Sequence, residues 1–378
     1  MCSVLDVVAQ LRMLQIHNLS AFFATLGCNT AGLPLSRGGG WFSLSVSRSA
    51  YPKPFKTISQ QRQLLESRGM VLADPAAAER WLNAVGYYRL SGYWYPYRVR
   101  RQPAGGPPII DDTFQAGTSF DRIIELYDFD RKLKLLVLDA IERVEVAMRV
   151  RVGHVLGRHG AFAHTDPNVL SPEFVGTAHP ALPPAHADWL TSEHAKWLRK
   201  VDQEQSRSKE EFVKHFKRKY GGPLPVWVVT EILDFGGLSR LYEGLKQIDR
   251  DDIAAGFNLR DNSGAGHGAA LVSWMKNLNY IRNSCAHHSR LWNRNIDVQL
   301  SHRHLLTVPD LHHAASPTAA KRVYASLAVL AYMLEHASPG SGWSAEIVNH
   351  ITTELAAMNR SDSEMGCPPG WTTQPLWT

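Results

Sequence analysis

The chain has 378 residues, of which 44% are hydrophobic and 20% charged, a balance typical of a soluble globular protein and not of a disordered or membrane-embedded one. Its net charge of +6 is compatible with a nucleic-acid partner but does not require one. The four cysteines form no CxxC pair and no metal-ligand spacing, so we expect free thiols in a reducing compartment, no cofactor and no metal site.

Residues 1–50 are predicted to form a weakly ordered N-terminal extension. An apolar helical pattern runs from Val4 to Leu26 and is followed by a glycine run at 38–40. Polar residues interrupt this pattern, so it matches neither the apolar core of a signal peptide nor the run of about 18 apolar residues that a membrane span needs. We therefore expect a cytoplasmic protein without a membrane partner.

From residue 51 to residue 378 the sequence predicts one principal helical domain. Thr57 or Ser59 can cap a first helix that Gly69 closes, and Asp74-Pro75 opens a second one. Further helical patterns cover residues 119–156, 196–220, 223–245, 271–281, 316–336 and 344–358. The pattern at 223–245 is expected to break at Gly236-Gly237, and residues 100–110 and 158–190 are expected to be loops. Alternating β-branched runs do not dominate anywhere, so the predicted fold class is all-α, a helical bundle.

The stretch at 86–98, GYYRLSGYWYPYR, holds five tyrosines and one tryptophan. These rings can stack on the bases of RNA. Alternatively, they pack the joint between two helices and bond their hydroxyl groups at its rim. A similar choice applies to the lysines of 209–219, which either neutralise phosphates or form a solvated helix face.

The long helical pattern at 119–156 carries Arg149 and His154. These two residues have the same spacing as the candidate catalytic pair described below, so they are candidate RNA contacts. The alternative is a helical ion pair of Arg149 with Glu142 or Glu145, worth only a few tenths of a kcal/mol.

The most concentrated set of functional side chains lies at 278–294, LNYIRNSCAHHSRLWNR. It follows apolar residues with helical spacing, so a buried helix is expected to present the set at its end. The candidate catalytic residues are Arg282, Asn283 and His287. The additional candidates for RNA binding are His288, Arg290 and Arg294.

The segment RNSCAHHSRLWNR resembles the Arg-Asn-x-x-Ala-His signature of the Abi-like proteins, bacterial abortive-infection factors of the HEPN superfamily. Residues 53–70, 86–98, 223–245 and 365–377 resemble the same family in the same order, so the resemblance spans roughly 52–377. It implies a HEPN-type bundle with extra helices and a phage-defence toxin that cleaves RNA without metal. Some members are linked to small non-coding RNAs, so such an RNA is an implied partner.

The residue types of the motif suit this chemistry. RNA carries its own nucleophile, the 2′-hydroxyl. His287 can take or give a proton because an unperturbed imidazole has a pKa of about 6.5. Arg282 can hold two phosphate oxygens with its planar fork, and Asn283 can orient the imidazole or the phosphate.

The spacing raises a geometric difficulty. On an ideal helix Arg282 and His287 lie roughly 140° apart, so they face one phosphate only if the helix ends or distorts between them. The alternative is a symmetric homodimer in which two copies of the motif pool their side chains, as the resemblance implies.

A structural reading of the motif remains open beside catalysis. Arg and His near a helix C-terminus complement the helix dipole, and Asn can cap it. The alternative function is therefore a non-catalytic module that binds RNA or a toxin–antitoxin partner. At the other end of the chain, Trp371, Leu376 and Trp377 are expected to dock on the bundle rather than to dangle.

Overall fold

The computed structural model describes residues 53–103, 105–176 and 192–378. Tertiary contacts divide the chain after Phe55, and the unit 56–378 contains every helix and strand described below. The predicted extension at 1–50 lies outside the described residues.

The unit is built mostly from helices, which confirms the predicted all-α class. Its first helices are α3 (Ile58–Ser67), α4 (Pro75–Ala84), α5 (Tyr87–Trp94) and the long α6 (Phe120–Gly157). The middle part holds α7 (Pro172–Val175), α9 (Glu193–Arg207), α10 (Glu211–Tyr220), α11 (Val226–Ile232), α12 (Phe235–Glu243) and α13 (Gln247–Ala255). The last part holds α14 (Gly268–Ala286), α15 (His302–Leu306), α16 (Pro317–Lys321), α17 (Val323–Ala337) and α18 (Trp343–Ala357). Short 3-10 helices are η1 (Tyr95–Tyr97), η2 (Ala163–Thr165), η3 (Pro309–Ala314), η4 (Asp362–Met365), η5 (Trp371–Thr373) and η6 (Pro375–Trp377).

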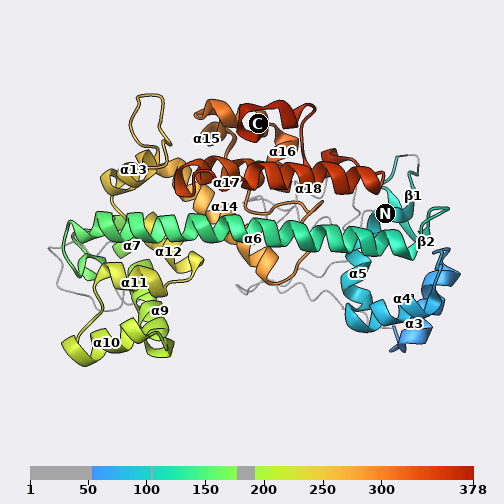
Figure 1. Ribbon diagram of the computed structural model, residues 1–378, viewed down its shortest axis with the longest axis horizontal. Coiled ribbons are helices and arrows are strands. Elements are labelled where there is room, and N and C mark those ends of the chain that lie inside the picture. Colours follow the sequence, from blue (N-terminus) through green and yellow to red (C-terminus); the bar gives the residue numbers. More distant parts are fainter. Residues whose placement is uncertain (1–52, 104, 177–191) are drawn as a thin grey trace, which may run out of the picture. The chain divides into compact units, whose positions relative to one another are not determined.

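Helix α6 is the element around which the others pack. It is 38 residues long, so it extends over about 57 Å. Helices α5, α11, α12, α13, α14, α17 and α18 all contact it. Figure 1 shows α17 and α18 along one side of α6 and α11 along the other. Because α6 is covered from more than one side, its buried residues form a wide band instead of a narrow stripe.

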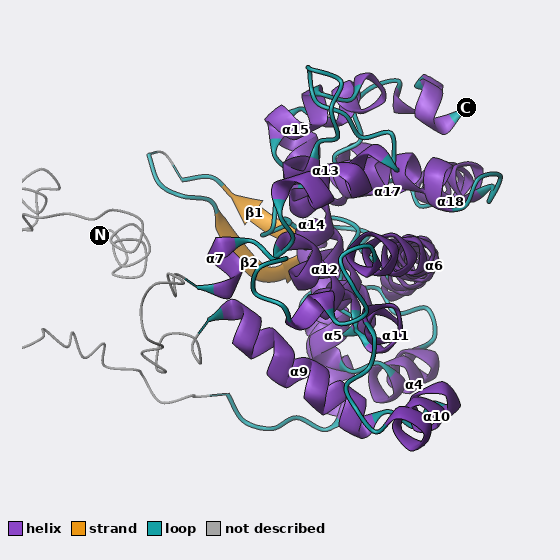
Figure 2. Cartoon of the chain, turned by 90° about the vertical axis from the view of Figure 1, so that its left-hand side faces the viewer, coloured by secondary structure: helices purple, strands orange, loops and turns teal. Residues whose placement is uncertain are grey.

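A small β-hairpin is present where the sequence predicted only a loop. Strands β1 (Arg98–Arg101) and β2 (Ile109–Phe114) pair antiparallel, with Arg98 opposite Phe114 and Arg101 opposite Ile109 (Figure 2). The Pro- and Gly-rich residues between the strands do form the loop. The strands escaped detection because β1 consists mostly of arginine, whose side chains pair with Asp111 and Asp112 across the hairpin.

The predicted helix starts are confirmed where a side chain caps the helix. Thr57 and Gln60 form a reciprocal capping box at α3, and the Asp74 carboxylate accepts hydrogen bonds from two backbone amides at the start of α4. The predicted break at Gly236-Gly237 is wrong. The chain turns at Leu233–Asp234, because Asp234 caps α12 by accepting a 2.6 Å hydrogen bond from the Gly237 amide.

The C-terminal tail docks on the bundle, as predicted. Trp371 is 2% exposed and Trp377 is 5% exposed, and their rings meet edge to face at 5.3 Å. The indole N–H of Trp377 donates to the Tyr324 hydroxyl on α17 at 3.1 Å, and that of Trp371 donates to Asp362 at 2.7 Å. The tail is therefore held by burial of its apolar side chains and by the hydrogen bonds of both indole N–H groups.

None of the described helices combines the length and the apolar character that crossing a bilayer requires.

Replacing both Trp371 and Trp377 by alanine should lower the free energy of unfolding by several kcal/mol, since a buried Trp→Ala change costs about 3–5 kcal/mol. Urea unfolding measures the loss. The control is Ile248→Ala, at a side chain that is 75% exposed, which should leave the unfolding midpoint unchanged. Equal midpoints for the double variant and the control would contradict the anchoring role.

A buried histidine pair makes stability depend on pH. His194 donates from Nε2 to the backbone carbonyl of His164 at 2.8 Å, and burial lowers the pKa of His164 to about 4 and that of His194 in the same direction. Between the unfolded pKa of about 6.5 and the folded pKa, the unfolded chain binds more protons, so stability falls as the pH falls.

From pH 7 to pH 5, protonation of the unfolded His164 alone should therefore lower the free energy of unfolding by about 1–2 kcal/mol. His164→Leu should lose less stability over this range, and His215→Leu, at an exposed site on α10, should lose as much as the unaltered protein. Urea unfolding at the two pH values decides this, and an equally steep loss for His164→Leu would refute it.

Candidate functional site

Helix α14 carries the motif at its C-terminal end. The apolar side chains predicted to be buried, Leu271, Trp274, Met275, Leu278 and Ile281, are all fully buried. They fix α14 against α6, α12, α13 and α17, so the orientation of its C-terminal end is set by the core.

The end of α14 is a two-bond helix cap that exposes both histidines. The His288 amide donates to the Cys285 carbonyl and the Ser289 amide donates to the Ser284 carbonyl, both at 2.9 Å. His287 is the C-cap residue, and His288 has a φ of +57°, a left-handed conformation that costs a non-glycine residue roughly 1 kcal/mol. Arg89 on α5 supports this turn by donating to the His288 carbonyl at 2.6 Å.

Arg282 and Asn283 point away from these histidines. The Arg282 guanidinium donates from Nη1 to Oδ1 of Asn283 at 3.3 Å. Burial raises the pKa of Glu145 on α6, and the positive charges of Arg149 and Arg282 oppose this rise. Arg282 also helps to lower the pKa of Asp234 at the start of α12, although Lys200 and the Gly237 amide contribute more. The Arg282 charge thus acts on carboxylates of α6 and of the residue that caps α12.

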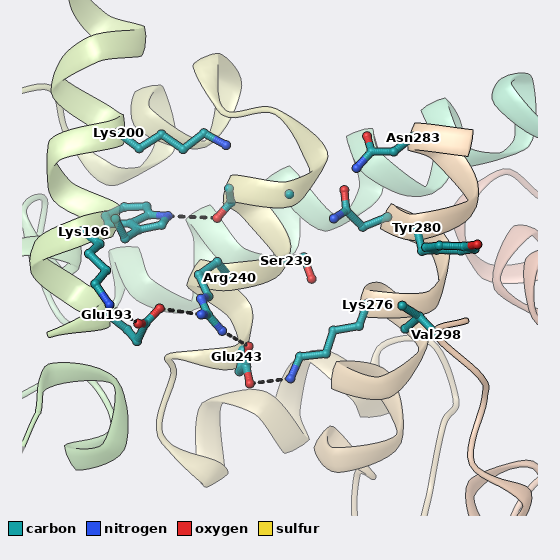
Figure 3. A pocket seen from close by; sticks show the side chains of 14 residues that line it. Glu193, Lys196, Lys200, Ser239, Arg240, Glu243, Lys276, Tyr280, Asn283 and Val298 are labelled. Carbon is teal, nitrogen blue, oxygen red and sulfur yellow. Dashed lines mark hydrogen bonds and ion pairs between the residues drawn. The ribbon is translucent and has the colours of Figure 1, made fainter. Parts of the chain in front are cut away.

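Asn283 lines a groove of about 640 Å³ between α9, α12 and α14, which we call the ion-pair groove (Figure 3). Each of its four cations is bonded to a carboxylate, and Lys200 uses Asp234 for this. Arg240 bonds to both Glu193 and Glu243, Lys276 bonds to Glu243 at 2.6 Å, and Lys196 bonds to Glu193 at 2.7 Å. An array of this kind offers little net charge to a polyanion.

His287 and His288 line a different groove, of about 670 Å³, between α5 and the segment after α14. We call it the tyrosine groove, and its lining residues are Tyr88, Arg89, Ser91, Gly92, Tyr93, Tyr95, His287, His288, Ser289, Arg290 and Arg294. None of these described lining residues is acidic. Arg290 is half-buried and donates to the Gly92 carbonyl, and Arg294 lies 5.5 Å from the Tyr280 ring centroid and 3.8 Å from Asp297.

The structure therefore gathers His287, His288, Arg290 and Arg294 in one groove and places Asn283 in another. Arg282 and His287 make no hydrogen bond to each other within the described chain. The reason is that α14 remains helical through Ala286, so the large angular separation expected from the spacing is retained.

The second pair of candidates lies elsewhere on α6. Arg149 bonds to Glu145 at 2.5 Å and to the Leu233 carbonyl at 2.9 Å, which confirms the predicted helical ion pair. His154 is exposed and lines a third groove with Arg149 and Trp227. This groove is separate from the tyrosine groove, although the positive charges of Arg149 and Arg282 both oppose the burial-induced rise in the pKa of Glu145.

The rings of 86–98 divide between the two predicted roles. Tyr93 and Trp94 are buried, and Tyr87 meets Trp94 edge to face at 4.9 Å, so these three pack the joint between helices. Tyr88 is 81% exposed and Tyr95 is 43% exposed. Tyr97 is half-buried, packs against the core and has the Arg360 guanidinium 4.9 Å from its ring centroid. Of the six rings, Tyr88 and Tyr95 are therefore the exposed ones.

The residue that holds the tyrosine groove together was not among the predicted site residues. Asp130 on α6 is fully buried and accepts hydrogen bonds from the Tyr93 hydroxyl at 2.7 Å, from Lys134 at 3.1 Å and from the Leu291 and Trp292 amides at 3.0 and 2.8 Å. It joins α5, α6 and the segment after the motif. An Asp–Lys pair at i,i+4 among apolar residues was the available signal.

Two other kinds of chemistry receive no support at this site. Burial raises the pKa of the Cys285 thiol to about 12, so it is a neutral thiol and not a nucleophilic thiolate at neutral pH. Across the described residues, no three His, Cys, Asp or Glu side chains are grouped so that they could hold a metal ion.

Comparison with known proteins adds one finding. A family model described as "Abi-like protein" matches residues 80–293, which is more than half of the chain and includes the whole motif. The stretches at 53–70 and 365–377 fall outside the match. No curated protein and no solved structure matches the chain.

Asp130→Ala should lower the free energy of unfolding by about 3–5 kcal/mol, because it leaves the buried Lys134 ammonium and two backbone amides without their acceptor. The control is Asp128→Ala on the same helix, where the side chain is 40% exposed and pairs with Arg131. Urea unfolding of both variants provides the measurement. An unfolding midpoint for Asp130→Ala as high as that of the control would show that this carboxylate does not stabilise the fold as predicted.

Proposed function

The chain belongs to the Abi-like protein family, a membership that suggests a role in abortive infection, and from this premise we propose that it is a metal-independent endoribonuclease of phage defence. The observation that carries the proposal is the tyrosine groove. Two imidazoles and three guanidinium groups line it without an acidic neighbour among the lining residues. Such a surface attracts the phosphates of a nucleic acid.

In the proposed reaction, His287 removes the proton from a 2′-hydroxyl of RNA. The 2′-oxygen forms a bond to the adjacent phosphorus, and the bond from phosphorus to the 5′-oxygen breaks. A second imidazole donates a proton to this leaving oxygen, so the products are a 2′,3′-cyclic phosphate and a 5′-hydroxyl end. An exposed imidazole at a helix end suits the transfer because it is open to solvent and to substrate.

Arg282 is proposed to stabilise the phosphate from a second copy of the chain. Within one chain it faces α6 and α12, and its hydrogen bond to Asn283 gives the amide a role in orienting the guanidinium. A symmetric homodimer that brings Arg282 of one chain to His287 of the other would complete the site. The base and the acid would then be His287 from each chain.

A second function, non-catalytic binding of RNA or of a protein partner, is favoured by the same separation. Arg282 and His287 face different sides of α14, and the end of the helix is stabilised as a cap without any catalytic role. In this case the toxin would act by sequestering its target.

His287→Ala should reduce cleavage of labelled RNA by at least about 100-fold, the usual contribution of a general acid–base group. Arg282→Ala should cause a loss of about 100-fold or more, because it removes a cation that stabilises charge on the phosphate. Cleavage should persist in EDTA and yield 2′,3′-cyclic phosphate ends. Binding should weaken more for Arg282→Ala, which loses a phosphate contact. His215→Ala, at an exposed histidine on α10, is the matched control and should cleave normally.

Mixing the Arg282→Ala and His287→Ala proteins tests the composite site, because a mixed dimer would hold one Arg282–His287 pair but only one His287. Partial recovery of cleavage is expected where His288 replaces the second His287, and no recovery is expected where both His287 side chains are required. Full activity of His287→Ala, or a strict need for Mg²⁺, would disprove the proposed mechanism, whereas tight RNA binding without cleavage by the unaltered protein would favour the second function.

A further inference from the structure

We infer that the ligand of the tyrosine groove is single-stranded RNA, and that Tyr88 and Tyr95 hold its unpaired bases by stacking. This inference rests on the proposed function, because it names the substrate class of the same site. It also assigns a role to two residues outside the Arg282–His287 motif.

The first support is the geometry of α5. The residues at positions 88, 91, 92 and 95 all line the groove, and this spacing of i, i+3, i+4 and i+7 places them on one helix face. The large rings stand at the two ends, roughly 10 Å apart along the helix axis, and small residues, Ser91 and Gly92, lie between them. The Arg290 side chain lies over Gly92 and donates to its carbonyl, so the face presents two aromatic rings with a guanidinium between them. Such a surface offers rings to bases and a cation to a phosphate.

The second support is the contrast between the rings of this stretch. Tyr93 and Trp94 serve the core, and Tyr93 gives its hydroxyl to Asp130. Tyr88, by contrast, is 81% exposed, although other residues of α5 are buried. The Arg98 guanidinium, which is paired with Asp112, lies 6.0 Å from the centroid of the Tyr95 ring, so this exposed ring is held by a cation–π contact on one side.

The third support is the charge around the rings. Arg89 and Arg290 donate hydrogen bonds to backbone carbonyl groups, those of His288 and Gly92, and among the described residues neither forms an ion pair with a carboxylate. In the ion-pair groove, by comparison, the arginine and two of the lysines are bonded to glutamate. Cations beside open rings are the combination that binds single strands, since cations follow the backbone and rings take the bases.

Duplex RNA does not fit this arrangement. Its bases are stacked on one another inside an A-form helix, and only unpaired bases can turn outward onto a protein ring. The tyrosine groove should therefore select loops, bulges and single strands, and the base next to the cleaved linkage should lie on Tyr88 close to His287.

The test uses binding of the full-length protein to a short, labelled 2′-O-methyl oligoribonucleotide, which lacks the free 2′-hydroxyl and is not cleaved. Fluorescence anisotropy gives the Kd. Tyr88→Ala should weaken binding about tenfold, the effect of losing one stacked base, and Tyr95→Ala should weaken it in the same direction. Tyr88→Phe should bind like the unaltered protein because it keeps the ring.

The matched control is Tyr220→Ala, since Tyr220 is 62% exposed and lies beside a cation, Lys219, but on α10. It should bind normally. A duplex of the same sequence should bind more weakly than the single strand. Unchanged binding by Tyr88→Ala, or equal affinity for duplex and single strand, would overturn the inference.

The outcome separates this inference from the proposed reaction. If Tyr88→Ala loses binding but the unaltered protein cleaves no RNA, stacking stands and the nuclease proposal fails. If the unaltered protein cleaves RNA while Tyr88→Ala binds and cleaves equally well, the nuclease stands and the stacking role fails.

Discussion

A single buried carboxylate determines where the two walls of the candidate site lie. Asp130 is fully removed from water, and an isolated buried charge is costly unless donors surround it. Its donors come from three separate parts of the chain: the Tyr93 hydroxyl on α5, the Lys134 ammonium on α6, and the amides of Leu291 and Trp292 after the motif. Because all of them must converge on one group, α5 and the end of α14 cannot shift independently.

The backbone at the C-terminal end of α14 is also constrained, although less strongly. His288 adopts a left-handed conformation that glycine would adopt at lower cost, and the turn is supported by two backbone hydrogen bonds and by Arg89. A histidine placed there keeps an imidazole at the groove at a cost of roughly 1 kcal/mol. The preference for glycine in a left-handed conformation is therefore not followed at His288. Such local preferences are expected to be overridden at functional sites.

Electrostatics separates two grooves that look similar in size. In the ion-pair groove the arginine and two of the lysines are bonded to glutamates, so this charge stabilises local structure (Figure 3). In the tyrosine groove Arg89 and Arg290 bond to backbone carbonyl groups, and among the described residues neither forms an ion pair with a carboxylate. The small net charge of +6 conceals this difference, because only the placement of each acidic partner reveals it.

Local periodicity is enough to predict the helical class and the course of α6 and α14, and residues that bond within their own turn predict the caps at Thr57 and Asp74. Docking of the tail was predicted from its two tryptophans, large rings that favour burial, although the partner, Tyr324, lies far away in the chain. Long-range packing determines that Tyr88 is open while Tyr93 is buried, that Asn283 and His287 line different grooves, and that Asp130 joins distant segments. These features depend on partners far apart in the chain, and a pattern of neighbouring residues carries no record of which distant group completes a hydrogen bond.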